Sequence, residues 1–403
     1  MAKNPIGIKL GRGPLLAIGL MSGTSHDGIS AALNEIDPRA RPPARVLACQ
    51  TFPYPKRLRA ETLEASGGGK IGAGALSRLN FELGRALGDA AIAIARQARV
   101  SLDRVAFIGS HGHTFFHLPP RRARHGEIAS TLQLGESAVI AAMTSRPVVA
   151  DFRAMDLALG GEGAPLAPLA HLWFFADRKR GRAIQNIGGI GNATYLPAGA
   201  SPDGADVIAF DTGPGVGLID ALASRISAGR IRMDRGGKIA ARGRVNAPLL
   251  AALMRHPYFR RRPPKSTGRE EFGADYLDRF VAAGRRSGLT DVDLMATLTA
   301  LTARSIGDAV RRFIVPRGRI DQLIVCGGGA RNPALMKMLA AEVPGIEVIP
   351  ASDAGVDGDA LEAAAFAILG YQMLRGHAGN LPKVTGARAP AILGKLTLPP
   401  SPL

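Results

Sequence analysis

Residues 19–30 read GLMSGTSHDGIS, and residues 185–194 read QNIGGIGNAT. Each stretch interrupts an apolar run that is typical of a β-strand. Glycine lets backbone N–H groups come close to an anion, because it has no Cβ and tolerates positive φ. We therefore expect the two stretches to form two halves of a phosphate clamp. For either one alone, an ordinary hairpin turn is the alternative.

A third stretch has the same character. Residues 323–339 read LIVCGGGARNPALMKML, a buried-strand run followed by three glycines and a helical pattern that opens near Asn332. A strand-to-helix turn of this kind is what a nucleotide base or ribose requires. The three stretches together favour a nucleotide-binding protein.

Composition narrows the class of protein. A length of 403 residues with 46% hydrophobic content predicts two domains, each with its own core. No apolar run reaches the roughly 18 to 20 residues that span a bilayer, and the first residues carry no secretion signal. The two cysteines, Cys49 and Cys326, lie far apart in sequence. We expect a cytoplasmic protein without a disulfide framework or a zinc site, and no membrane partner.

The net charge of +18 could indicate a nucleic-acid-binding protein. However, the arginines are scattered, and no aromatic residues alternate with them to stack on bases. A DNA-binding relative would carry a helix-turn-helix before the first glycine stretch, where only about 14 residues precede the first strand. We expect no nucleic-acid partner, and a surface that attracts anionic substrates.

The elements follow one plan twice. In the first half we expect strands at residues 15–21, 29–34, 45–52, 105–110 and 147–150, helices at 71–98 and 138–143, and a loop at 151–168. In the second half we expect strands at 184–187, 193–196, 207–210 and 322–326, and helices at 216–227, 276–287, 294–313 and 361–374.

This repetition describes an α/β protein with the two-domain actin-like ATPase or sugar kinase fold and ATP in the interdomain cleft. We expect an N-terminal domain at 1–148 with the first phosphate turn. A C-terminal domain at 149–384 would hold the second phosphate turn, the catalytic aspartate and the adenosine turn. The final segment, 385–403, would return to the first domain.

Eight ordered blocks carry a specific resemblance: GLMSGTSHDG, GSHGHTFFH, VVADFRAMDLALGGEGAPLAP, NIGGIGNAT, FDTGPGVGLID, PPKSTGRE, VCGGGARNPALM and LPKVTGA. They cover about residues 16–396, and their order and spacing resemble the anhydro-N-acetylmuramic acid kinases. The resemblance implies an ATP-dependent sugar kinase of peptidoglycan recycling. It would open the 1,6-anhydro ring with water and phosphorylate O6, giving N-acetylmuramic acid 6-phosphate. The alternative is a divergent kinase-fold sensor that binds sugar or nucleotide without efficient turnover.

Asp211 is the candidate catalytic residue. It follows the apolar residues 207–210, which places it at a strand's carboxyl end, where open α/β sheets bind ligands. The turn at 212–215 and the helix start after it would offer N–H groups to negative charge. A carboxylate there can act as a general base toward water, and the resemblance implies a catalytic aspartate at this position. The alternative is that Asp211 caps the helix.

The expected cofactors are ATP and Mg²⁺. Asp27 is the candidate Mg²⁺ ligand, through water, with a plain turn aspartate as the alternative. We expect ATP contacts from Gly23, Thr24, Ser25, His26, Asp27, Gly28, Ile29, Ser30, Gly188, Gly189, Gly327, Gly328, Gly329 and Asn332. The expected partners are ATP and a small-molecule sugar, and a homodimer is compatible with the sequence.

We expect sugar contacts from His111, Asp151, Arg153, Gly163 and Ala164. Arg153 would hold the muramyl carboxylate or a phosphate by a bidentate fork, with Asp151 orienting it; an exposed ion pair is the alternative. Residues 265–269 form a basic loop that would act as a lid, or be a solvated loop.

Five positions depart from the family pattern: His26, Ser30, His113, Glu162 and Val216. They bear on substrate choice and activity. A carboxylate at Glu162 would repel an anionic substrate unless Arg153 or another cation pairs with it.

Overall fold

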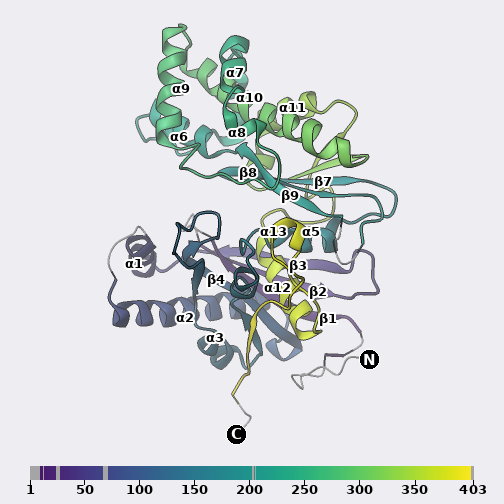
Figure 1. Cartoon of the computed structure of the whole chain (residues 1–403). Helices are drawn as coiled ribbons and strands as arrows, with labels where there is room; N and C mark the ends of the chain where they lie inside the picture. The colour runs from purple at the N-terminus through teal and green to yellow at the C-terminus, as the bar shows by residue number, and fades with distance from the viewer. Residues whose placement is uncertain are drawn as a thin grey trace. The chain divides into compact units, whose positions relative to one another are not determined.

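The computed structural model describes residues 10–11, 13–23, 28–66, 71–201, 204 and 206–400. The chain divides into two units, each built on a β-sheet with helices packed against it (Figure 1). Unit 1 comprises Met1–Phe175, Ser201–Ala205 and Asp359–Leu403. Unit 2 comprises Ala176–Ala200 and Asp206–Gly358.

The mixed sheet of unit 1 has the strand order β12-β6-β4-β1-β2-β3, and β5 pairs with β4. Its strands are β1 (Leu15–Ser22), β2 (Ile29–Ile36), β3 (Ala44–Phe52), β4 (Val105–Leu118), β5 (Ser130–Leu134), β6 (Val148–Ala150) and β12 (Lys395–Thr397). Strands β1, β2 and β3 are antiparallel, whereas β4 runs parallel to β1, and β6 parallel to β4. The two strands expected on either side of the first glycine stretch are therefore present, and they pair with each other.

Helices pack on both faces of the sheet of unit 1. The long helix α2 (Ala73–Gln97) buries Leu79, Leu83, Leu87 and Ile94 against Ile18 and Leu20 of β1, in a core that α3 (Ser137–Thr144) completes. Side chains alternate along a strand, so Gly19 faces the other way. There α12 (Leu361–Leu374) packs so closely that a Cβ on Gly19 would lie 1.9 Å from the Ala363 carbonyl oxygen. Glycine is required at this contact.

This packing explains where the units divide. Helix α12 lies against β1, β2 and β4, and also against α5 (Ala167–Phe175). The first stretch of unit 1 therefore runs to Phe175 rather than to residue 148, and the chain returns at Asp359 rather than at 385. The loop predicted at 151–168 contains a short helix, α4 (Ala154–Ala158), and α13 (Pro382–Thr385) precedes the final strand.

Unit 2 repeats the sheet plan of unit 1. Its strands are β7 (Arg182–Ile187), β8 (Ile190–Leu196), β9 (Ile208–Pro214), β10 (Gln322–Cys326) and β11 (Glu347–Pro350), in the order β11-β10-β7-β8-β9. Again the first three strands are antiparallel, and the next two run parallel to the first. The predicted repetition across two halves, and the α/β class, are confirmed in this duplicated strand order.

The helices of unit 2 build two further clusters of buried residues. They are α6 (Gly217–Ile226), α7 (Ala247–Leu253), α8 (Pro257–Arg260), α9 (Ala274–Arg286), α10 (Asp291–Ala309) and α11 (Pro333–Glu342). Helix α10 is buried along nearly its whole length and begins with a capping box between Thr290 and Asp293. Strand β9 and helices α6, α7, α8 and α11 pack against it.

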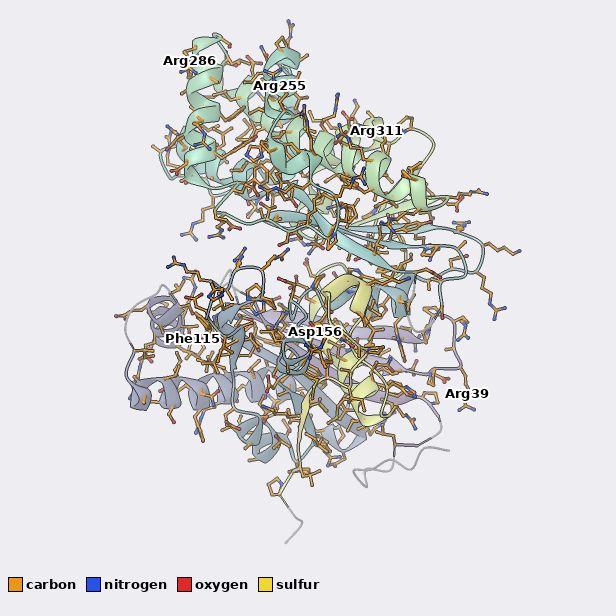
Figure 2. The ribbon with its side chains drawn as sticks, viewed as in Figure 1. Arg39, Phe115, Asp156, Arg255, Arg286 and Arg311 are labelled. Carbon is orange, nitrogen blue, oxygen red and sulfur yellow. The ribbon has the colours of Figure 1, made fainter. Side chains whose placement is uncertain are left out.

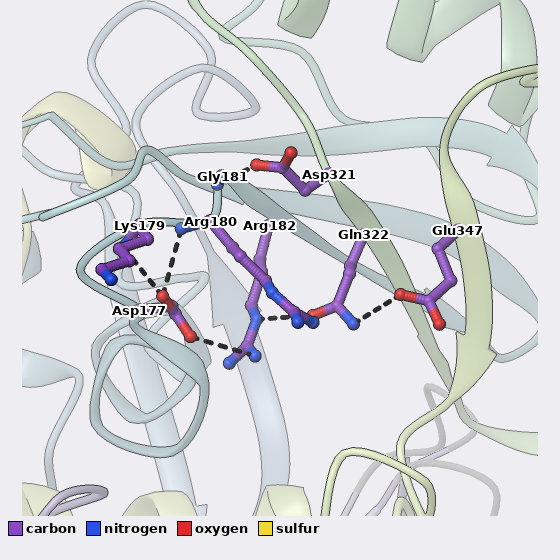
Figure 3. A network of polar contacts seen from close by, with 8 residues as sticks. All are labelled: Asp177, Lys179, Arg180, Gly181, Arg182, Asp321, Gln322 and Glu347. Carbon is purple, nitrogen blue, oxygen red and sulfur yellow. Dashed lines mark hydrogen bonds and ion pairs between the residues drawn. The ribbon is translucent and has the colours of Figure 1, made fainter.

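A polar network ties the amino-terminal ends of three strands of unit 2 (Figure 3). Arg182, Gln322 and Glu347 occupy one register row across β7, β10 and β11. The Arg182 guanidinium donates to Gln322 Oε1 at 2.8 Å, and the Gln322 amide donates to Glu347 Oε2 at 2.8 Å. Asp177 pairs with Arg182 at 3.3 Å. The side chains at the amino-terminal ends of these strands therefore bond to one another. Open α/β sheets bind ligands at the carboxyl ends of their strands, so we expect the ligand site there.

The excess positive charge is spread over the surface. Arg39, Arg255, Arg286 and Arg311 are all exposed and extend from four different segments (Figure 2). Within the described part of the chain, no helix is both long and apolar enough to cross a bilayer.

Candidate active site

Asp211 lies in β9, half-buried, and is held from three directions by one segment of unit 2. Its N–H donates to the Lys265 carbonyl oxygen at 3.1 Å, and its own carbonyl accepts from the Tyr258 hydroxyl at 2.6 Å. The Thr267 N–H donates to its Oδ2 at 2.9 Å. Because β9 is an edge strand, this segment satisfies backbone groups that no neighbouring strand reaches.

The structure corrects the local prediction around Asp211. Strand β9 continues to Pro214, because Gly213 and Pro214 still pair with β8, so Asp211 lies inside the strand and not at its end. Helix α6 begins only at Gly217, and Val216 occupies its N-cap position. The alternative that Asp211 caps this helix is therefore wrong.

The N–H groups at the start of α6 were expected to face an anion. Instead, Val216 N–H donates to the Gly188 carbonyl at 2.8 Å, and the N–H groups of Gly215 and Gly217 donate to the Gly189 carbonyl at 3.1 and 3.2 Å. For these three donors the expectation is wrong, since the second glycine turn accepts their hydrogen bonds. The same bonds fix the turn firmly against α6.

The second and third glycine turns are neighbours in unit 2, because β7 and β10 are adjacent parallel strands. A Cβ on Gly327 would lie 2.3 Å from Asn186 Oδ1, and one on Gly329 would lie 2.5 Å from Ile187 Cβ. In contrast, no described atom lies within 4 Å of a Cβ built on Gly189, and only Val216, at 3.9 Å, is that close to one on Gly328. Packing within the described residues thus explains glycine at 327 and 329. The open space at 189 and 328 fits a bound phosphate or ribose.

Two asparagines that we did not select from the sequence also lie in this region. Asn186 of β7 pairs with Asn192 of β8, which pairs with Asp211 of β9, so the three share one register row. They are candidates for polar contacts beside the carboxylate. Asn332, which was expected to touch the nucleotide, caps α11 by accepting from the Leu335 N–H at 3.0 Å, so its oxygen has a structural role.

The first glycine turn is described only in part. Gly23 follows β1, whereas Thr24, Ser25, His26 and Asp27 lie outside the described residues. Glycine at 28 is required by packing, because a Cβ there would lie 2.5 Å from the Phe52 carbonyl oxygen. Ile29 was expected to contact the nucleotide, but its side chain belongs to the core of unit 1. The hydroxyl of Ser30 bonds that of Thr51 at 3.0 Å.

His113 is buried beside Ser22, at the end of β1. Strand β4 extends to Leu118, beyond the strand expected at 105–110, because β5 pairs with it. His113 Nδ1 lies 2.8 Å from the Ser22 hydroxyl, which also contacts the Tyr54 hydroxyl. His113 therefore supports the last residue of β1 from within the protein.

The sugar-side candidates His111, Arg153 and Gly163 come together in unit 1. Arg153 donates through Nε to His111 Nε2 at 2.9 Å, and through Nη1 to the Gly163 carbonyl at 2.7 Å. Because a guanidinium can only donate, His111 Nε2 must accept, and Nδ1 carries the proton that bonds the Gly112 carbonyl at 3.1 Å. Burial, together with the charge of Arg153, holds the pKa of His111 well below its usual range. The imidazole is neutral.

Arg153 keeps its charge at neutral pH. Burial lowers the pKa of Arg153 to about 10, against the opposing effects of the Glu362 and Asp156 carboxylates. Glu362, on α12, is a residue that sequence reasoning missed. Its pKa is raised by burial and lowered by Arg153. The charge of Arg153 therefore opposes the effect of burial on Glu362.

Asp151 does not take the role expected of it. Its carboxylate pairs with Lys395 of β12 at 2.5 Å, whereas His111 and Gly163 orient Arg153. Asp151 has a φ of 56°, an uncommon conformation for a residue other than glycine. Gly163 has a φ of 68° and is fixed by its N–H bond to Asp156 Oδ2 at 2.8 Å. Ala164, next to it, is half-buried.

Comparison with known proteins gives the family of the chain. The sequence model for "Anhydro-N-acetylmuramic acid kinase" matches residues 15–399. The chain belongs to the anhydro-N-acetylmuramic acid kinase family. This confirms the resemblance and the predicted class of enzyme, an ATP-dependent sugar kinase.

Named relatives match over almost the whole chain. The anhydro-N-acetylmuramic acid kinase of Caldanaerobacter subterraneus subsp. tengcongensis is 40% identical over 95% of this chain and 97% of its own. That of Salinibacter ruber is 43% identical over 95% and 96%. Among solved structures, component A of (R)-2-hydroxyglutaryl-CoA dehydratase from Acidaminococcus fermentans aligns with a TM-score of 0.46 and 12% identity, over 90% of this chain and 99% of its own.

Glu162, which departs from the family pattern, has a cationic partner. Arg121 Nε lies 2.9 Å from its carboxylate, and both side chains are partly exposed. The expected repulsion of an anionic substrate is therefore offset, and by Arg121 rather than by Arg153.

We expect Glu162→Gln to change kcat/KM for the sugar by less than about fivefold, because exposed ion pairs contribute about 0–1 kcal/mol. Arg121→Met leaves the carboxylate without this partner and is expected to lower kcat/KM about tenfold, corresponding to ~1.4 kcal/mol. The double variant should recover. Steady-state kinetics of the three variants check this; an unaffected Arg121→Met enzyme would mean that Glu162 lies too far from the substrate to act on it.

Proposed function

We propose that this chain transfers the γ-phosphoryl group of ATP to O6 of anhydro-N-acetylmuramic acid while water opens the 1,6-anhydro ring. The product is N-acetylmuramic acid 6-phosphate, and the reaction belongs to peptidoglycan recycling in the cytoplasm. Family membership supports the substrate pair. The observation that carries the chemistry is the half-buried Asp211 carboxylate, oriented by the Thr267 N–H at 2.9 Å.

Asp211 is the proposed general base. Water attacks the anomeric carbon and gives one proton to the Asp211 carboxylate, and its oxygen stays on that carbon as a hydroxyl. The bond between the anomeric carbon and O6 breaks, O6 attacks the γ-phosphorus, and ADP leaves. Proton acceptance by a positioned side chain typically contributes about 10² to 10⁴ in rate. The hydrogen bond from the Thr267 N–H orients this carboxylate.

The glycine turns of unit 2 are the proposed nucleotide contacts. Gly188, Gly189 and Gly328 lie at the carboxyl ends of β7 and β10, and the space at 189 and 328 admits a ligand close to the backbone. Mg²⁺, when bound with ATP, neutralises charge on the phosphates. We retain Asp27 as its proposed water-mediated ligand. Within the described residues, no three His, Cys, Asp or Glu side chains gather to hold a metal.

Arg153 is the proposed contact for the muramyl carboxylate. Two of its five N–H groups are used by His111 and Gly163, and these bonds fix the plane of the guanidinium. An oriented guanidinium suits a carboxylate better than a mobile one, because less side-chain freedom is lost on binding. His111, Gly163 and Ala164 remain proposed neighbours of the sugar, and Asp151, held by Lys395, is proposed to shape the loop.

The test is product analysis. Purified protein, ATP, MgCl₂ and anhydro-N-acetylmuramic acid are mixed in H₂¹⁸O, and the product is examined by mass spectrometry. We expect sugar-dependent ADP, a 6-phosphorylated sugar, and one ¹⁸O at the anomeric carbon. A phosphorylated product that keeps the anhydro ring would contradict ring opening. Binding of the sugar without ADP formation would instead favour the sensor alternative.

A further inference from the structure

Lys265 is a buried lysine whose ammonium lies among aromatic rings. Lys265 is only 6% exposed. The sequence predicted instead that its basic loop, residues 265–269, would be solvated or act as a lid. The ammonium lies 4.5 Å from the ring centre of Tyr258, 4.9 Å from that of Phe313 and 5.9 Å from that of Phe210. Such faces attract a desolvated cation. The carbonyl oxygen of Tyr258, at 3.5 Å from Nζ, adds a polar partner.

Four charged side chains act on this ammonium. Burial lowers the pKa of Lys265 to about 8, the carboxylates of Asp308 and Asp211 raise it, and the guanidinium groups of Arg261 and Arg312 lower it. Lys265 is therefore mostly protonated at neutral pH. Asp211 is thus one of the two carboxylates that favour the charged form of this ammonium.

The same residues that surround the ammonium also hold Asp211. Tyr258, whose ring faces Nζ, donates its hydroxyl to the Asp211 carbonyl. Phe210 is the chain neighbour of Asp211, and the carbonyl of Lys265 itself accepts from the Asp211 N–H. Two residues further on, Thr267 bonds the carboxylate. The Thr267 hydroxyl donates to Glu271 Oε2 at 2.8 Å, and this bond also holds Thr267 in place.

We propose that Lys265 is a positioning residue for Asp211: its ammonium, held among the rings of Tyr258, Phe313 and Phe210, fixes the segment 258–267 that aims the carboxylate. This inference rests on the proposed role of Asp211 as the general base. It assigns the PPKSTGRE block a role in the chemistry of β9, in place of the lid that the sequence predicted.

The test compares Lys265→Met with Lys265→Arg, using MgATP and anhydro-N-acetylmuramic acid as substrates. Lys265→Met retains the apolar stem without the charge. We expect kcat to fall about 10- to 100-fold, since slight misplacement of a reacting group costs about this much. The acid limb of the kcat–pH profile should also move upward, because removing a cation that acts on a carboxylate raises the pKa of that carboxylate.

Lys265→Arg restores a charge that does not titrate. We expect it to recover most of kcat and to remove any decline of wild-type activity above about pH 8, since a guanidinium stays protonated there. The matched control is Lys337→Met, the same change at an exposed lysine of α11, which should leave kcat and its pH profile unchanged. Circular dichroism and thermal unfolding establish that each variant is folded.

Two results would overturn the proposal. One is a folded Lys265→Met enzyme with wild-type kcat and an unmoved acid limb. The other is a loss confined to KM. Asp211→Asn, assayed in parallel, separates this inference from the proposed function. If Asp211→Asn is inactive while Lys265→Met is normal, the base assignment stands and the positioning role fails. If Asp211→Asn is active, the base assignment itself fails.

Discussion

Asp211→Asn is expected to reduce kcat by about 10² to 10⁴-fold, the range typical of a general base. The asparagine keeps the shape of the side chain, and its carbonyl oxygen can still accept from the Thr267 N–H, so the local structure should survive. What it lacks is an oxygen that accepts a proton from water. The KM for ATP and the unfolding temperature should therefore stay close to wild type.

Single-turnover measurement of ADP formation, with calorimetry of nucleotide binding, checks this prediction. Asp278→Asn, at an exposed aspartate of α9 that pairs with Arg225, is the matched control and should retain full activity. Near wild-type kcat in Asp211→Asn would require a different base. The first alternatives to examine would be groups in unit 2 near the register row of Asn186, Asn192 and Asp211.

Much of the fold was predictable because its signals are local. Strand β10 at Gln322–Cys326 and helix α12 at Leu361–Leu374 have the bounds that their apolar runs predicted. The repeated hairpin, helix and strand plan also follows from patterns within short windows. The unit boundaries were less accessible, since they depend on α12 packing against strands about 250 to 350 residues earlier in the chain.

The sequence predicted which segments form the candidate site, but not which distant residues contact them. Asp211 stood out through its strand, but Tyr258 and Thr267 lie 47 and 56 residues away in sequence. No periodic pattern states which loop covers an edge strand. For the same reason, Lys265 looked like part of a charged surface loop, since three rings from separate segments bury its ammonium.

Glycine positions show what sequence alone does not distinguish. Gly189 and Gly215 both belong to phosphate-type turns in the sequence, yet they differ in the structure. A Cβ on Gly215 would lie 2.0 Å from the Gly188 carbonyl oxygen, whereas no described atom lies within 4 Å of one on Gly189. The protein's own described packing therefore requires glycine at 215, and only a ligand would require it at 189.

This contrast gives the second large effect. Gly189→Ala should fold with an unchanged unfolding temperature but raise the KM for ATP about 10- to 100-fold, because hydrogen bonds to charged groups contribute about 1.5–3 kcal/mol. Gly215→Ala should instead lower stability by about 1–3 kcal/mol, through overpacking against the turn. Thermal unfolding with and without ATP separates the two cases, and Gly74→Ala, in helix α2, is the neutral control. An unaltered ATP affinity in Gly189→Ala would remove the second glycine turn from the nucleotide site and leave it as a hairpin that anchors α6.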